Sequence, residues 1–161
     1  MLRTECKKDE RQGTRFMTDK LVIDASVALK WQFKDEQDID DPMRLLAGFV
    51  SGEIELLTPT IFSYEIANAL SIAVSRERIS EKDGMGAIKD ILALGMRQVS
   101  FDGLVEKTYL LSRNHKWSLY DCAYLALAEH EGCFLYTADL RFYNTVKDDM
   151  DSLKWVGNYG R

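Results

Sequence analysis

Short apolar runs alternate with longer amphipathic stretches along this chain of 161 residues. The apolar runs resemble strands buried in a sheet, and they predict strands at Leu21–Asp24, Glu53–Leu57, Arg97–Phe101, Cys133–Thr137 and Lys154–Val156. Between these runs, apolar residues recur at helical spacing, which predicts helices at Ala25–Phe33, Met43–Val50, Thr60–Arg78, Ser80–Gly95, Asp102–Asn114 and Ser118–Glu131. Strands that alternate with helices predict an α/β fold, here a three-layer α/β/α sandwich with a central, mostly parallel sheet.

Local signals mark where two of these helices begin. Thr58-Pro59 predicts a helix start, with the threonine as the N-cap and the proline at the first helical position. Ser80, followed three residues later by Asp83, resembles a capping sequence and opens the next helix. The acid-rich stretch 35–41 does not match the pattern of a calcium loop, so we expect a solvated loop there.

Length and composition predict one folded domain, which we place at residues 19–157. Residues 1–18 are polar and show neither strand nor helix periodicity, so we expect a poorly ordered N-terminal extension. Hydrophobic residues at 46% and charged residues at 29% are typical of a globular protein. No apolar run approaches the ~20 residues of a membrane span. The three cysteines have unrelated spacings, so we expect a cytoplasmic protein without a disulfide framework.

The charge balance neither requires nor excludes nucleic acid as a partner. The formal net charge is −5, which does not suit a globally basic nucleic-acid-binding protein. The four acids discussed below account for most of that charge, so a polyanion would be held by local basic residues or by metal ions. Candidate phosphate-binding residues, for each of which a solvated helix surface is an equally good interpretation, are Lys30, Arg76, Arg113, Lys116 and Arg141.

Four acids stand where apolar residues would be expected, and we name them the acid quartet: Asp24, Glu65, Asp121 and Asp139. Each has a structural interpretation when taken alone. Glu65 suits a helix surface, Asp121 could form a capping box with Ser118, and Asp139 could begin a turn. Asp24 is the hardest to explain in this way, because a charged group at the end of a buried strand is costly unless it is paired or bound to metal.

Taken together, the acid quartet predicts a metal site. Carboxylates at the ends of parallel strands lie on one edge of the sheet, where helix starts can add further acids. Carboxylates at close range raise one another's pKa unless a cation lies between them. Ligand sets made only of oxygen suit Mg²⁺ or Mn²⁺ rather than zinc. Divalent metals held by carboxylates are typical of enzymes that hydrolyse phosphodiesters, where they generate hydroxide and stabilise the leaving oxygen.

Four segments, in the right order and at the right spacing, resemble PIN domains. They are Asp24-Ala25-Ser26, Glu65-Ile66-Ala67-Asn68-Ala69-Leu70, Tyr120-Asp121-Cys122-Ala123-Tyr124-Leu125-Ala126-Leu127-Ala128 and Leu135-Tyr136-Thr137-Ala138-Asp139. The chain is most similar to the VapC-type toxin ribonucleases of prokaryotic toxin–antitoxin pairs, over about residues 20–156. The N-terminal extension departs from that family, whose members usually begin at the first strand.

The resemblance implies that the acid quartet holds Mg²⁺ or Mn²⁺ and forms the catalytic site of an endoribonuclease. Ser26 and Thr137 match hydroxyl positions that often line the site, and Asn68 matches an asparagine found three residues after the helix glutamate. Water activated by the metal would attack the RNA phosphorus in line. The implied partners are an RNA substrate, a cognate antitoxin and a second copy of the chain in a homodimer, with no membrane involved.

Three other functions remain open from the residues themselves. An α/β phosphatase with Asp24 as the nucleophile would have a second aspartate two residues later, where this chain has Ser26. Cys122 could pair with a histidine as a thiol nucleophile, but its place on an apolar helix face favours core packing. The third is a non-catalytic PIN-like interaction module, whose contact residues would include Trp31, Phe33 and Tyr64.

Overall fold

The computed structural model describes residues 19–33, 38–100 and 102–160. The predicted N-terminal extension, residues 1–18, lies outside the described residues. Five parallel strands form one sheet in the order β3-β2-β1-β4-β5: β1 (Asp19–Ile23), β2 (Ile54–Pro59), β3 (Arg97–Val99), β4 (Phe134–Thr137) and β5 (Leu153–Trp155). The helices are α1 (Ala25–Lys30), α2 (Asp40–Val50), α3 (Phe62–Ser75), α4 (Glu81–Ala93), α5 (Asp102–His115), α6 (Leu119–Glu131), α7 (Leu140–Val146) and the short 3-10 helix η1 (Val156–Asn158).

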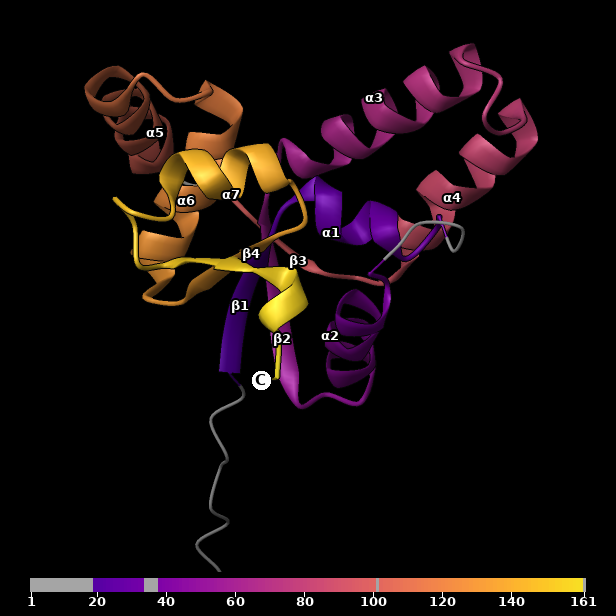
Figure 1. Ribbon diagram of the computed structural model, residues 1–161, viewed down its shortest axis with the longest axis horizontal. Helices are drawn as coiled ribbons and strands as arrows, with labels where there is room; N and C mark the ends of the chain where they lie inside the picture. The colour runs from indigo at the N-terminus through magenta and orange to yellow at the C-terminus, as the bar shows by residue number, and fades with distance from the viewer. Residues whose placement is uncertain (1–18, 34–37, 101, 161) are drawn as a thin grey trace, which may run out of the picture.

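The strand β1 lies at the centre of the sheet, between β2 and β4. Its residues Leu21, Val22 and Ile23 are all buried. Since consecutive side chains of a strand point to opposite faces, helices must cover both faces of the sheet. Helix α6 packs across β1, β2 and β4 with α5 against it, while α2 contacts β2 and α7 contacts β4 and β5 (Figure 1). The predicted three-layer α/β/α fold is confirmed.

Helices α3 and α4 pack against each other and extend together away from the sheet (Figure 1). Gly84 permits their close approach, because a Cβ at this position would lie 3.0 Å from Val74 Cγ2. Ser80 caps α4 as predicted, with its hydroxyl accepting a hydrogen bond from the Asp83 amide at 3.1 Å. The first turn of α3, which contains Glu65, directly follows β2 and therefore lies near the carboxyl edge of the sheet.

The predicted helix start at Thr58-Pro59 is wrong. Both residues are buried at the end of β2, where they pair with β3, and α3 begins only at Phe62. The Thr58 hydroxyl has no hydrogen-bond partner, so it caps no helix. Proline is tolerated here because it is the last residue of the strand, where its missing N–H interrupts the ladder least.

The helices differ from the prediction in other places as well. Helix α2 begins at Asp40 rather than Met43, which places Asp40 and Asp41 in its first turn, where negative charge is favourable. Helix α7 follows Asp139 directly and was not predicted. It has seven residues, so its sequence spans too few turns to show a clear helical period.

Several residues considered for other roles belong to the core. Cys122 is fully buried on α6, and burial raises the pKa of its thiol to about 11, which contradicts a nucleophilic role. Trp31 is also buried, and its indole N–H donates to the Pro42 carbonyl at 2.9 Å, so it offers no contact surface. Cys122 and Cys133 are both free thiols. In the described ranges, we find no helix with the length and apolar character that crossing a membrane requires.

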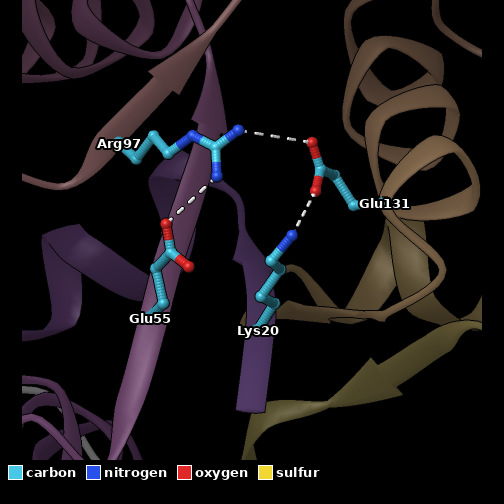
Figure 2. A network of polar contacts seen from close by, with 4 residues as sticks. All are labelled: Lys20, Glu55, Arg97 and Glu131. Carbon is cyan, nitrogen blue, oxygen red and sulfur yellow. Dashed lines mark hydrogen bonds and ion pairs between the residues drawn. The ribbon is translucent and has the colours of Figure 1, made fainter. Parts of the chain in front are cut away.

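An ion-pair network joins four elements at the amino-terminal edge of the sheet (Figure 2). Glu131, the last residue of α6, contacts Lys20 of β1 at 3.0 Å and Arg97 of β3 at 3.8 Å. Arg97 also contacts Glu55 of β2 at 3.2 Å. The Glu131 side chain is only 10% exposed, whereas the two cations are about half exposed. The network therefore attaches the end of α6 to three strands at the edge opposite to Asp24.

Candidate active site

The acid quartet comes from four elements that meet at the carboxyl edge of the parallel sheet. Asp24 follows β1 and is the N-cap of α1, and Asp139 follows the adjacent strand β4 and is the N-cap of α7. Glu65 lies in the first turn of α3, and Asp121 lies in the first turn of α6. The parallel topology thus brings together acids that are separated by more than one hundred residues in the sequence.

Asp24 is buried, and its two carboxylate oxygens accept hydrogen bonds from two hydroxyl groups. The Ser26 hydroxyl donates to Oδ1 and the Thr137 hydroxyl donates to Oδ2, each at 2.5 Å, while the Val27 amide donates to Oδ1 at 3.3 Å. Burial raises the pKa of Asp24 from 3.8 to about 7, although these hydrogen bonds act in the opposite direction. A buried carboxylate with this environment favours a bound cation.

The same two hydroxyls join the turn after β1 to the turn after β4. Ser26 Oγ accepts a hydrogen bond from the Ala138 amide at 2.8 Å, and Thr137 Oγ1 accepts one from the Asp139 amide at 3.0 Å. Each hydroxyl therefore donates to Asp24 and accepts from the backbone that leads into α7. Both predicted supporting hydroxyls lie within the site.

Asp121 interacts electrostatically with the other three acids. Burial raises its pKa to about 6, and the neighbouring carboxylates of Asp139 and Glu65 add to this effect, while Arg141 opposes it. Asp121 in turn contributes to the raised pKa of Asp24. The Ser118 side chain does not cap the backbone of α6, so a full capping box is not formed. It does make a hydrogen bond with the Asp121 carboxyl group, which lowers the pKa of Asp121.

Asp139 has a structural role as well as its place in the acid quartet. Its Oδ1 atom accepts hydrogen bonds from the Arg141 amide at 2.8 Å and from the Phe142 amide at 3.0 Å. These bonds cap α7 and fix the direction of the carboxylate. Asp139 therefore begins a turn, as its place in the sequence suggested, and it also lies near Asp121.

Glu65 accepts a hydrogen bond from a tyrosine that was not among the predicted site residues. The Tyr124 hydroxyl donates to Glu65 Oε2. Glu65 is half-buried, and burial raises the pKa of its carboxyl group. Burial and the Glu65 carboxylate also raise the pKa of Tyr124, so the phenol remains a neutral donor. Its only signal in the sequence is its position, one helical turn after Asp121 in an otherwise apolar helix.

The chemistry of the donor set fits a hard divalent cation. Four carboxylates and two neutral hydroxyls provide oxygen alone, as Mg²⁺ and Mn²⁺ prefer. As the side chains stand, no three His, Cys, Asp or Glu residues within the described part of the chain lie close enough together to hold an ion. The acid quartet is therefore a set of electrostatically coupled neighbours rather than a finished coordination shell.

Two pockets flank the acid quartet, and four of the five predicted phosphate-binding residues line them. The α1–α3 pocket, of about 340 Å³, is lined by Lys30 and Arg76 and reaches the site through Ser26 and Ala138. The α6–α7 pocket, of about 150 Å³, is lined by Lys116, Arg141, Asp121 and Asp139, among others.

The structure does not bring Arg113, the fifth predicted phosphate-binding residue, or Asn68, a predicted supporting residue, into contact with the carboxylates. Arg113 is exposed in the last turn of α5 and lines neither of the two flanking pockets. Asn68 is exposed on α3, one turn beyond Glu65. Asn68 therefore lies near the edge of the site, and Arg113 lies outside the flanking pockets.

A known protein family matches the part of the chain that carries these residues. The PIN domain family matches residues 21–148, a range that includes the whole acid quartet. This chain belongs to the PIN domain family. This chain is 34% identical over 125 residues to the ribonuclease VapC9 of Mycobacterium tuberculosis. The alignment covers 78% of this chain and 90% of VapC9. The chain is 30% identical to the ribonuclease VapC12 of the same organism, with 75% and 88% covered. The PIN domain of this chain is therefore of the VapC ribonuclease type.

Solved structures show the same fold. PAE2754 from Pyrobaculum aerophilum superposes on this PIN domain with a TM-score of 0.64 at 17% identity, covering 87% of this chain and 91% of that one. VapC20 of Mycobacterium tuberculosis, described as a sarcin–ricin loop cleaving toxin, superposes with a TM-score of 0.57 at 15% identity, covering 78% and 95%. The five-stranded parallel sheet with its helices is thus the PIN domain architecture.

Proposed function

We propose that this PIN domain protein is a Mg²⁺- or Mn²⁺-dependent endoribonuclease whose catalytic and metal-binding residues are the acid quartet. The observation that carries the proposal is the electrostatic coupling of Asp121 to the other three acids in a partly buried site. Like charges in such a place are unfavourable, and a cation between them removes the conflict. When bound, a divalent ion offsets the negative charge that develops on the phosphate oxygens and activates a water nucleophile.

The remaining groups of the site orient the carboxylates and the substrate. Ser26 and Thr137 hold the Asp24 carboxylate in one direction by donating to both of its oxygens. The backbone amides at the start of α7 do the same for Asp139. Arg141 lies near Asp121 and supplies positive charge beside the acids, where it can contact a phosphate oxygen. Asn68, at the edge of the site, is proposed to contact the RNA.

The two flanking pockets support an RNA strand that passes across the acid quartet. Lys30 and Arg76 would bind phosphates on one side, and Lys116 and Arg141 on the other, with the scissile phosphate between them. Arg113, which is exposed and further away, would add a peripheral contact. A strand held on both sides of the cleavage point suits an endonuclease. Replacing any one of these cations by alanine should weaken RNA binding. It should also reduce the slope of log K for RNA binding against log salt concentration by roughly one in magnitude.

We further propose that the chain is the toxin of a type II toxin–antitoxin pair, acts in the cytoplasm and forms a homodimer silenced by an antitoxin protein. The support is the similarity to VapC ribonucleases and to VapC20, which is described as a toxin. Helix α5 also exposes Val105, Tyr109 and Leu110, a cluster of apolar side chains suited to a protein partner. Light scattering measures the mass of the chain alone, which tests the homodimer, and its mass after co-expression with the antitoxin protein, which tests the complex. If the chain is a monomer in both samples, neither assembly forms.

The direct test is cleavage of a mixed RNA substrate with Mg²⁺ or Mn²⁺, with EDTA as the control. Asp24→Asn and Asp121→Asn should abolish metal-dependent cleavage, because each removes a charged oxygen ligand. Glu131→Gln is the matched control, since it removes the same charge from α6 at the opposite edge of the sheet. Full activity of the Asp24 or Asp121 variant refutes the assignment of the acid quartet. Cleavage that survives EDTA refutes the dependence on metal.

A further inference from the structure

Tyr124 occupies an unusual place for a buried tyrosine. It lies on α6 one turn after Asp121, and only 1% of its surface is exposed. A buried phenol hydroxyl is costly unless it makes a hydrogen bond. A phenylalanine would fill the same volume without that requirement. The hydroxyl group therefore needs an explanation that packing alone does not supply.

The hydroxyl of Tyr124 connects three of the elements that carry the acid quartet. It donates to Glu65 Oε2 on α3. It also lies beside the backbone amide of Ala25, the residue that follows Asp24, and this amide lowers the pKa of the phenol. One oxygen atom on α6 therefore bonds to α3 and lies against the start of α1. The fourth element, the turn after β4, is attached to Asp24 through Thr137.

We propose that Tyr124 is a positioning residue that holds the Glu65 carboxylate in the orientation needed for metal binding. This inference rests on the proposed function. Glu65 reaches the site on a flexible side chain, and ordering such a side chain opposes binding. Tyr124 has few rotatable bonds and is enclosed by the core, so its hydroxyl occupies a fixed place. A hydrogen bond from this fixed donor orders Glu65 before the ion arrives.

The test is Mn²⁺ binding by calorimetry to the full chain carrying Tyr124→Phe, followed by cleavage at increasing Mn²⁺. Losing a hydrogen-bond partner of a metal ligand typically weakens metal affinity about 10- to 100-fold, and we expect a loss in this range. Cleavage should be restored by raising Mn²⁺, with the KM for RNA unchanged. The matched control is Tyr143→Phe, which removes a phenol hydroxyl from a half-buried tyrosine whose ring contacts Trp155 and Lys147; its Mn²⁺ affinity should equal that of the wild type.

A second comparison separates positioning from general damage. If Tyr124 acts through Glu65, adding Tyr124→Phe to Glu65→Ala should not weaken Mn²⁺ binding further. This comparison also serves if the single Tyr124 variant is unstable, because the double variant removes both partners of the bond. The positioning role is overturned if Tyr124→Phe binds Mn²⁺ as tightly as the wild type, or if it weakens binding equally without Glu65. If the wild type neither binds Mn²⁺ nor cleaves RNA, the proposed function fails and this inference fails with it.

Discussion

The Asp24→Asn variant should be more stable than the wild-type protein at neutral pH when no divalent cation is present. The change removes a carboxylate that is buried at the end of β1. The neighbouring groups can accept the amide, because its oxygen can take the hydrogen bond from Ser26 and its NH₂ can donate to Thr137 Oγ1. The Thr137 proton can then turn toward Ser26 Oγ, which lies 3.4 Å away.

The size of the effect follows from the pKa of Asp24, which burial raises from 3.8 to about 7. Between these values the folded state keeps a proton that the unfolded state has released, so wild-type stability falls as the pH rises through this interval. At about 1.36 kcal/mol per pH unit, the free energy of unfolding of the wild type falls by about 2 kcal/mol by pH ~5, relative to its value at low pH. Above pH ~7 the decrease reaches at most about 4 kcal/mol. Asparagine does not titrate, so the advantage of Asp24→Asn should grow by about 2–3 kcal/mol between pH ~5 and pH ~8.

The measurement is urea unfolding in EDTA at both pH values, for the wild type, Asp24→Asn and Glu131→Gln. The Glu131 variant controls for the loss of a negative charge outside the site, at the other edge of the sheet. Mn²⁺ should then stabilise the wild type more than Asp24→Asn, since only the wild type has the full set of ligands. If Asp24→Asn is the less stable protein at the higher pH, the hydroxyl hydrogen bonds outweigh burial and the reasoning is refuted.

Three other outcomes are expected. Thr137→Val should lower the free energy of unfolding by about 1–3 kcal/mol, because the Asp139 amide loses its acceptor; unchanged urea unfolding would show that another group takes its place. Glu131→Gln should cost less than about 1 kcal/mol, since the two cations of its network are about half exposed, and a larger loss in the same assay would contradict this. Mn²⁺ affinity should fall as the pH drops through the raised pKa values of Asp24 and Asp121, because binding displaces their protons; calorimetry in two buffers measures that release, and a pH-independent affinity would contradict it.

The sequence predicted the α/β fold well because its strongest signals are also its most buried segments. The run Leu21–Ile23 is apolar without interruption, and the structure buries all of it at the centre of the sheet. Prediction failed where a local signal had two meanings. Thr58-Pro59 is an acceptable helix start and also an acceptable strand end, and only the pairing with β3 decides between them. The helix α7 was missed because it is short.

Some residues of the candidate site could be recognised from the sequence, and others only from the structure. Acids that interrupt apolar patterns are visible in a sequence, because a carboxylate such as Asp24 is unexpected at the end of a buried strand. Tyr124 could not be recognised as a site residue in this way, since a tyrosine in an apolar helix is ordinary core composition. Its partner Glu65 lies 59 residues earlier in the chain, so the hydrogen bond between them exists only in three dimensions.

The sequence by itself determined the identity of the acids and, apart from the short helix α7, the succession of strands and helices along the chain, because both depend on local periodicity and on residue type. Only the tertiary structure decided which of these acids interact and which groups hold them. Asp121 is coupled to the other acids because parallel strands end at one edge and α6 begins beside it. Thr137 bonds to Asp24 and Tyr124 bonds to Glu65 because their hydroxyls come from elements 113 and 59 residues away in the chain. Such contacts depend on distances between side chains in space, which periodicity along the chain does not encode.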